Sequence, residues 1–203
     1  YLPDDSNVAV IYPENTYGYK INETVDAISQ NSKKNIHLVF NGEIYNFAEL
    51  ASHYGISHNA NSDTHVILHL LELIGFQETC KSLQGMFAIC AYCHLDQKVY
   101  LARDRFGSKP LYYYEDMTQL LIASDISSIT SIVDDEKVGT LTHKGAVHFL
   151  AFGYISIDHS NMYGINNIAP GSINYIAPSR KLIYINNVNN LNNKASEEDW
   201  LSD

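Results

Sequence analysis

Residues 40–46 (FNGEIYN) follow the apolar run 36–39 and carry more polar groups than a chain reversal needs. Asn-Gly is a common turn dipeptide, so the pattern alone predicts a turn at Asn41 and Gly42. The same two residues offer a side-chain amide and a backbone N–H side by side, and a glycine lets a ligand approach the backbone closely. Two such donors can stabilise a developing oxyanion, and each is typically worth about 10²–10³ in rate.

A second candidate group lies at Ser62-Asp63, directly before the apolar stripe of a predicted helix. Either residue can serve as the helix N-cap, which is the ordinary role of these residue types at such a position. The alternative is functional: the carboxylate of Asp63 can accept the ammonium group of a substrate. Both interpretations stay open on the residues alone.

The segment 102–113 (ARDRFGSKPLYY) places three charges after a predicted strand, before Gly107 and Pro110 turn the chain. We expect an exposed corner in which Asp104 pairs with Arg103 or Arg105. An exposed pair of this kind contributes under about 1 kcal/mol, so the segment is interpreted as scaffold rather than as catalytic.

Residues 90–94 (CAYCH) match the C-x-x-C-H motif by which c-type haem is attached. The segment reads as a strand, however, and cysteines three apart on a strand point to opposite faces. The same geometry argues against a zinc site built from Cys90, Cys93 and His94. We therefore predict two semi-buried small residues and a hairpin histidine, and no metal site.

The composition narrows the function classes further. The chain has 203 residues, of which 45% are apolar, and a formal net charge of −10. An acidic chain without a basic patch argues against nucleic-acid and anionic-membrane partners, and no apolar run approaches the roughly 18–20 residues of a membrane span. The low, odd count of three cysteines predicts a reduced, cytoplasmic location.

The elements that must position these groups are mostly antiparallel strands. The patterns predict strands at 7–12 and 36–40, hairpins at 85–93/99–104, 110–115/120–125 and 171–177/182–186, and helices at 47–54, 64–75 and 144–152. The strands at 85–93 and 98–102 are apolar on both faces, which indicates sheets covered on both sides. The predicted fold is therefore α+β, as a four-layer α/β/β/α sandwich.

Taken together, these segments resemble a known family. FNGEIYNFAEL, SDTHVILHLLE, LQGMFAICAY, LARDRFGSKPLYY, LIASDISSI and FLAFGYISIDHSNMYGINNIAPGS look like successive blocks of the N-terminal glutaminase domain of glutamine-hydrolysing asparagine synthetases. These domains are class II glutamine amidotransferases of the Ntn-hydrolase type. The resemblance implies a glutaminase domain over residues 1–186 and a polar linker over 187–203 toward a synthetase domain.

The resemblance also implies a mechanism. In the family an N-terminal cysteine attacks the side-chain amide of glutamine, with its own α-amino group as base. Asn41 and Gly42 would hold the oxyanion, while the backbone at Glu43 and the carboxylate of Asp63 would hold glutamine. The ammonia would serve a synthetase domain, in cis or in trans, that uses ATP and Mg²⁺ to activate aspartate. This domain itself needs no cofactor, and a homodimer is open as an assembly.

The sequence departs from the family pattern at several positions. Residues 3–6 (PDDS) resemble a block that lies well inside the family's domain, so the first strand and the nucleophile are expected to be missing upstream of Tyr1, and the fragment to be inactive as given. The three cysteines match no catalytic position. Lys20 or Ile21 stands where the family has an arginine for the glutamine carboxylate, and lysine lacks the planar fork of arginine. His65 replaces the usual glutamate on a helix face.

These departures leave two functions open. The first is the glutaminase domain of an asparagine synthetase-like enzyme. The second is a pseudo-glutaminase, a sandwich retained as an interaction or regulatory module without catalysis. Because no Ser-Gly-Gly-type pyrophosphate loop occurs in the chain, ATP and Mg²⁺ are expected only in the missing synthetase domain.

Overall fold

The structure is a computed structural model. It describes residues 8–14, 18–22, 28–31, 36–56, 62–116, 119–155, 161–176 and 182–187, and it describes side chains within residues 36–176.

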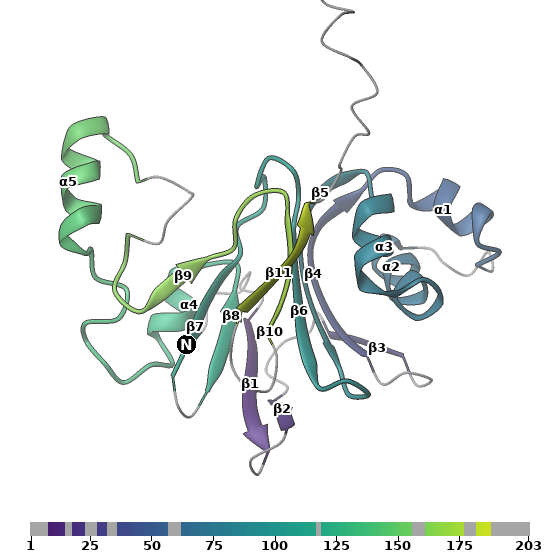
Figure 1. The fold of residues 1–203 in the computed structure, drawn as a ribbon, viewed down its shortest axis with the longest axis horizontal. Coiled ribbons are helices and arrows are strands. Elements are labelled where there is room, and N and C mark those ends of the chain that lie inside the picture. The colour runs from purple at the N-terminus through teal and green to yellow at the C-terminus, as the bar shows by residue number, and fades with distance from the viewer. Residues whose placement is uncertain are drawn as a thin grey trace, which may run out of the picture.

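Two antiparallel sheets face each other at the centre of the molecule (Figure 1). The larger has the order β11-β10-β6-β5-β4-β3. Its strands are β3 (Ile28–Asn31), β4 (Ile36–Ile44), β5 (Gly85–Cys93), β6 (Lys98–Arg103), β10 (Ser172–Ile176) and β11 (Leu182–Asn187). The smaller has the order β2-β1-β8-β7-β9. Its strands are β1 (Val8–Glu14), β2 (Gly18–Asn22), β7 (Tyr112–Glu115), β8 (Leu120–Ala123) and β9 (Ile165–Asn167).

Three apolar cores separate four layers, which confirms the predicted sandwich. The first lies between the larger sheet and three helices, α1 (Phe47–His53), α2 (Asp63–Leu73) and α3 (Gly75–Ser82). The second lies between the two sheets, where Cys90, Leu101 and Ile122 pack together. The third covers the outer face of the smaller sheet with α4 (Ile126–Thr130). Each sheet is thus buried on both faces, as its apolar strands require.

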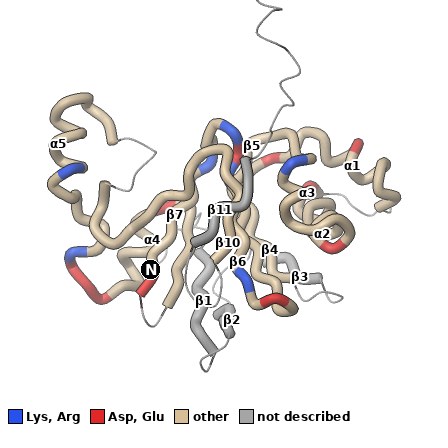
Figure 2. Tube along the Cα trace, in the orientation of Figure 1, with Lys and Arg blue, Asp and Glu red and all other residues tan. Residues whose placement is uncertain are grey.

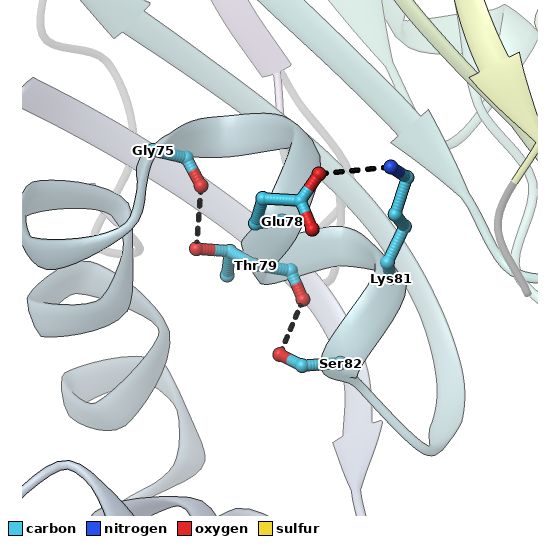
Figure 3. A network of polar contacts seen from close by, with 5 residues as sticks. All are labelled: Gly75, Glu78, Thr79, Lys81 and Ser82. Carbon is cyan, nitrogen blue, oxygen red and sulfur yellow. Dashed lines mark hydrogen bonds and ion pairs between the residues drawn. The ribbon is translucent and has the colours of Figure 1, made fainter.

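Helix α3 was not predicted, and it begins directly where α2 ends. Gly75 has φ +78°, a left-handed conformation that suits a chain leaving α2, and α3 starts at the same residue. Within α3 the Thr79 hydroxyl donates to the Gly75 carbonyl at 2.8 Å, and the Ser82 hydroxyl donates to the Thr79 carbonyl at 2.7 Å (Figure 3). These bonds brace α3 up to its last residue, whose carbonyl is used by the site described below.

Helix α5 (His143–Phe152) confirms the helix predicted at 144–152 and projects away from the sandwich (Figure 1). Of its ten residues only Gly145 is buried. The helix is held at its start, where the Thr142 hydroxyl accepts the Gly145 N–H at 3.0 Å and the Thr142 N–H donates to the Asn161 carbonyl at 2.8 Å. Its apolar side chains remain in solvent, led by Leu150, which is 83% exposed.

Charged residues of the described chain lie mainly at the ends of elements and in connecting loops (Figure 2). Among the described residues, no helix has the length and apolar character needed to cross a membrane. The predicted polar linker at 187–203 falls largely outside the described residues, so the division at residue 186 stays a prediction.

Candidate active site

The predicted turn at Asn41-Gly42 is wrong, because β4 runs straight through both residues to Ile44. Each residue from 36 to 44 has an antiparallel partner in β5, with Asn41 opposite Ala88 and Gly42 opposite Phe87. The chain turns only at Tyr45-Asn46. The nine-residue partner strand supplies a continuous ladder, and this pairing overrides the local turn preference of Asn-Gly.

Gly42 is glycine for two physical reasons. Its φ of +151° is a backbone angle that residues with a side chain rarely adopt. A Cβ atom at Gly42 would also lie 2.1 Å from the Met86 carbonyl oxygen and 2.7 Å from the Phe87 Cα. The strand therefore places a bare backbone against β5 at this point, and the backbone of β5 leaves no room for a side chain.

Asp63 is brought to the same place from the start of α2. Its Oδ2 accepts the Ile44 N–H at 3.1 Å, and its Oδ1 accepts the Thr64 N–H at 2.7 Å. The N-cap of α2 is Ser62, whose hydroxyl accepts the His65 N–H at 3.3 Å. The two open roles at 62–63 are thus divided: Ser62 caps the helix, and Asp63 ties the helix to the end of β4 with its carboxylate half-buried.

Asn41 faces the space between the two sheets. It lines a small cavity of about 20 Å³ together with Cys90, Leu111, Ile122 and other residues of both sheets. A cavity of that size holds about one water molecule and not an amino acid. This cavity beside Asn41 is therefore too small to hold glutamine.

Cys90, which lines the same small cavity as Asn41, is not an activated nucleophile. Cys90 is buried in the core between the sheets, and burial raises the pKa of its thiol to about 12. Burial also raises the pKa of the Cys80 thiol, which lies under the helices. Since the thiolate is the nucleophile, neither group is activated at neutral pH.

Cys90 and Cys93 lie on opposite faces of β5. Cys90 packs between the sheets, whereas Cys93 packs against the core beneath the helices. The predicted placement of the two cysteines on opposite faces of the strand is therefore confirmed. Within the described residues, no group of three or more His, Cys, Asp or Glu side chains could hold a metal ion.

Asn46 has a positioning role that the sequence did not reveal. Its side-chain amide donates to the Ser82 carbonyl at 2.9 Å and accepts the Gln84 N–H at 2.9 Å. It stands at the N-cap position of α1 but makes no side-chain capping bond there. This pair of bonds fastens the end of β4 to the loop between α3 and β5. The only local signal was an Asn directly before a helix, which normally indicates a cap.

The prediction of an exposed Arg103–Asp104 corner is wrong. Both residues are buried, at 4% and 2% exposure. The guanidinium of Arg103 donates to the carbonyls of Gly107, Lys109 and Ile168 and to the side-chain oxygen of Asn167. The two charges are instead satisfied separately, mainly by groups of the adjoining segment 106–109, with Asn167 and Ile168 as the distant partners of Arg103.

Asp104 connects this corner to the strand opposite Gly42. Its carboxylate accepts the N–H groups of Phe87, Phe106, Ser108 and Lys109 at 3.0–3.3 Å. Burial opposes ionisation of this carboxyl, but these hydrogen bonds and that of the Ser108 hydroxyl outweigh it and lower the pKa of Asp104. The bond to Phe87 fixes the backbone against which Gly42 lies, so Asp104 is a positioning residue.

The sequence of this chain matches the model of one known protein family. The profile of a family described as "Glutamine amidotransferase domain" matches residues 23–183, which is most of the chain and includes β4, α2 and the corner at 103–109. The chain belongs to the glutamine amidotransferase domain family.

Curated relatives of this amidotransferase domain are named asparagine synthetases. The chain is 30% identical over 145 residues to "Putative asparagine synthetase [glutamine-hydrolyzing] 2" of Methanocaldococcus jannaschii, covering 70% of this chain and 28% of that protein. It is 43% identical over 104 residues to "Asparagine synthetase [glutamine-hydrolyzing] 2" of Bacillus subtilis, covering 50% of this chain and 14% of that protein. The chain thus spans less than a third of the length of these relatives.

Two solved structures share the fold. One is titled "Glutamine phosphoribosylpyrophosphate (PRPP) amidotransferase from B. subtilis complexed with ADP and GMP", with a TM-score of 0.54 over 90% of this chain and 44% of that one, at 15% identity. The other is titled "Structure of the allosteric regulatory enzyme of purine biosynthesis", with a TM-score of 0.51 over 85% and 32% and 18% identity. At such identities the likeness shows the fold alone, here the four-layer sandwich.

The other residues predicted for the site, Glu43, Lys20 and Ile21, lie in two different sheets. Glu43 is exposed at the end of β4, beside Gly42. Lys20 and Ile21 lie in β2, at the edge of the smaller sheet, where they pair with Tyr12 and Ile11 of β1. The structure describes the backbone of β2 and not its side chains, so a role for Lys20 or Ile21 in binding glutamine stays a prediction.

Proposed function

We propose that this amidotransferase domain is the glutamine-hydrolysing part of an asparagine synthetase-like enzyme. Glutamine would be hydrolysed to glutamate and ammonia, and the ammonia would serve amide transfer to aspartate. The relatives' names support the acceptor reaction, and the fold and the family support glutamine as the substrate class.

The observation that carries the proposal is the junction of β4 and α2. Gly42 presents bare backbone in a glycine-only conformation, and the Asp63 carboxylate is bound to the Ile44 N–H two residues further on. We assign the oxyanion to the Asn41 side-chain amide and the Gly42 N–H. We assign the glutamine ammonium to Asp63 and further contacts to the Glu43 backbone. A fixed donor pair beside a fixed carboxylate suits a substrate that carries an amide at one end and an ammonium at the other.

The nucleophile in this proposal is a cysteine thiol that the 203 residues do not supply, since the buried Cys80 and Cys90 are not activated and no cysteine matches a catalytic position. The reaction therefore requires a thiol from outside this sequence. ATP and Mg²⁺ would act only in a synthetase domain in cis or in trans. A cytoplasmic location and a homodimer belong to the same proposal.

The alternative is a pseudo-glutaminase used for interaction or regulation. It is favoured by Lys20 or Ile21 at the position of the carboxylate-binding arginine, since a lysine offers a point charge where arginine offers two parallel donors. The two functions differ in whether the site binds glutamine at all.

The test is glutamine binding followed by turnover. We expect isothermal titration calorimetry to show glutamine binding to the full chain, and Asp63→Asn to abolish it while the exposed control Asp134→Asn binds as the wild type. In the chain joined to a family-type N-terminal cysteine segment, Asn41→Ala should cut ammonia release by about 10²–10³-fold. The exposed control Asn166→Ala should leave it unchanged. No glutamine binding at any concentration would favour the alternative, and unaltered turnover in Asn41→Ala would refute the oxyanion assignment.

A further inference from the structure

Two histidines stand one turn apart on the solvent side of α2. The Nε2 atoms of His65 and His69 are 3.0 Å apart, and their ring centroids are 4.5 Å apart at an interplanar angle of 66°. His65 is exposed and His69 is half-buried. Residues spaced i, i+4 on a helix lie on the same face, so the two rings converge because of their spacing.

The backbone that carries the pair is held firmly. The opposite face of α2 is buried in the core beneath the larger sheet, with Val66, Ile67 and Leu70 fully excluded from solvent. The first turn is fixed by the Ser62 cap and by the Asp63 carboxylate. A ligand held by the two imidazoles would therefore not have to order the helix first, which lowers the cost of binding.

The spacing of the two nitrogens fits a chelated metal ion. Imidazole nitrogens bind divalent transition metals at about 2.0–2.1 Å, and two nitrogens at that distance and 3.0 Å apart subtend roughly 95° at the metal. Tetrahedral ligands would be separated by about 3.3 Å at the same bond length. An angle near 90° is that of neighbouring ligands in a tetragonal site, the geometry that Cu²⁺ and Ni²⁺ prefer with nitrogen ligands.

In the structure the two rings are at hydrogen-bonding distance, and which ring donates depends on the tautomer. If both rings carry their proton on Nδ1, both Nε2 lone pairs are free to bind a metal ion, and two metal bonds replace the hydrogen bond. Within the described residues no third His, Cys, Asp or Glu completes a metal group with this pair. Water molecules would therefore fill the other coordination positions.

We propose that His65 and His69 form a two-histidine chelate for a divalent transition metal of the copper or nickel type. The site is separate from the glutamine chemistry and does not depend on it. It lies on the same first two turns of α2 that carry Asp63, so the bound metal braces the helix end that the candidate active site uses.

Calorimetric titration of the full chain with CuCl₂ or NiCl₂, in a non-coordinating buffer and without a histidine tag, tests the proposal. We expect one strong equivalent in the wild type. Loss of one ligand of a two-point chelate should weaken binding by about 100-fold in His65→Ala and in His69→Ala. The exposed control His143→Ala, on α5, should bind as the wild type. Binding should weaken on acidification, because protons compete for the imidazoles.

The copper complex gives a second readout that does not depend on affinity. Its electron paramagnetic resonance spectrum should show coupling to two nitrogens in the wild type and to one in each single variant. Circular dichroism should show native folding in both variants, because the side chains removed lie on the helix face away from the core. Equal affinity in wild type and His65→Ala, or equal weakening in His143→Ala, would overturn the proposal, as would a spectrum that is the same in all variants.

Discussion

Replacing Gly42 with alanine tests whether the bare backbone at the end of β4 is a structural necessity. The new methyl group would lie 2.1 Å from the Met86 carbonyl oxygen and 2.7 Å from the Phe87 Cα, and both are backbone atoms of the paired strand β5. They cannot rotate away as a flexible side chain could. The Phe87 N–H is also held by the buried Asp104 carboxylate, which resists a shift of β5.

The size of the effect follows from two costs. Holding a residue with a side chain at φ +151° costs about 1–3 kcal/mol. Forcing an extra methyl group into a packed site costs about 1–3 kcal/mol more. A combined loss of about 4 kcal/mol would lower the melting temperature of a domain of this size by roughly 8–16 °C.

The assay is thermal and urea unfolding followed by circular dichroism, with Gly55→Ala as the matched control. Gly55 also has a positive φ, of +64°, but a Cβ atom there would meet nothing within 4 Å. The control therefore carries backbone strain without a clash, at about 1–2 kcal/mol. Equal melting temperatures for the two variants would show that β4 and β5 do not approach as closely as described.

Three further perturbations test other parts of the site. Asn46→Ala removes two hydrogen bonds at a buried position and should cost about 2–3 kcal/mol in urea unfolding, whereas the exposed Asn166→Ala should cost nothing measurable. Asp104 has a lowered pKa in the folded state, so its ionised form stabilises the fold above the usual aspartate pKa of about 4, and that stability is lost as the pH falls through the lowered value. The difference in unfolding free energy between wild type and Asp104→Asn should thus be largest near neutral pH and shrink in acid. A difference that grows in acid would contradict the assigned hydrogen bonds. In native protein a thiol reagent should modify Cys93 while sparing Cys90, whose pKa is about 12, and urea should remove the contrast.

The sequence predicted well those elements whose local residue pattern agrees with their position in the folded domain. The hairpin of β5 and β6 has apolar residues on both faces and a polar four-residue turn at 94–97, and the structure places it inside the sandwich. Helix α5 begins at a Thr142 cap and ends at Gly153 in a left-handed conformation, as helix-end chemistry predicts. Local signals sufficed for these elements, and for the layered fold class.

The misses arose where distant contacts decide the structure. Asn41-Gly42 carries a strong turn signal, but the ladder to β5 keeps it extended. Arg103 and Asp104 look like surface charges, but loops at 106–109 and 167–168 surround them with backbone partners. A buried charge is stable only when such partners exist. Most of them lie within six residues of Arg103 or Asp104, whereas Asn167 and Ile168 lie 64 and 65 residues from Arg103. The local pattern does not show these distant partners.

Helix α5 has a thermodynamic consequence of its own. Since only Gly145 of its ten residues is buried, melting this helix exposes little apolar surface that was not already in water. Its opening should therefore contribute little to the denaturant sensitivity or heat capacity of global unfolding, which scale with newly exposed area. Backbone amides of α5 should exchange with solvent deuterium long before those of β5, because α5 can unfold locally while the two sheets stay folded.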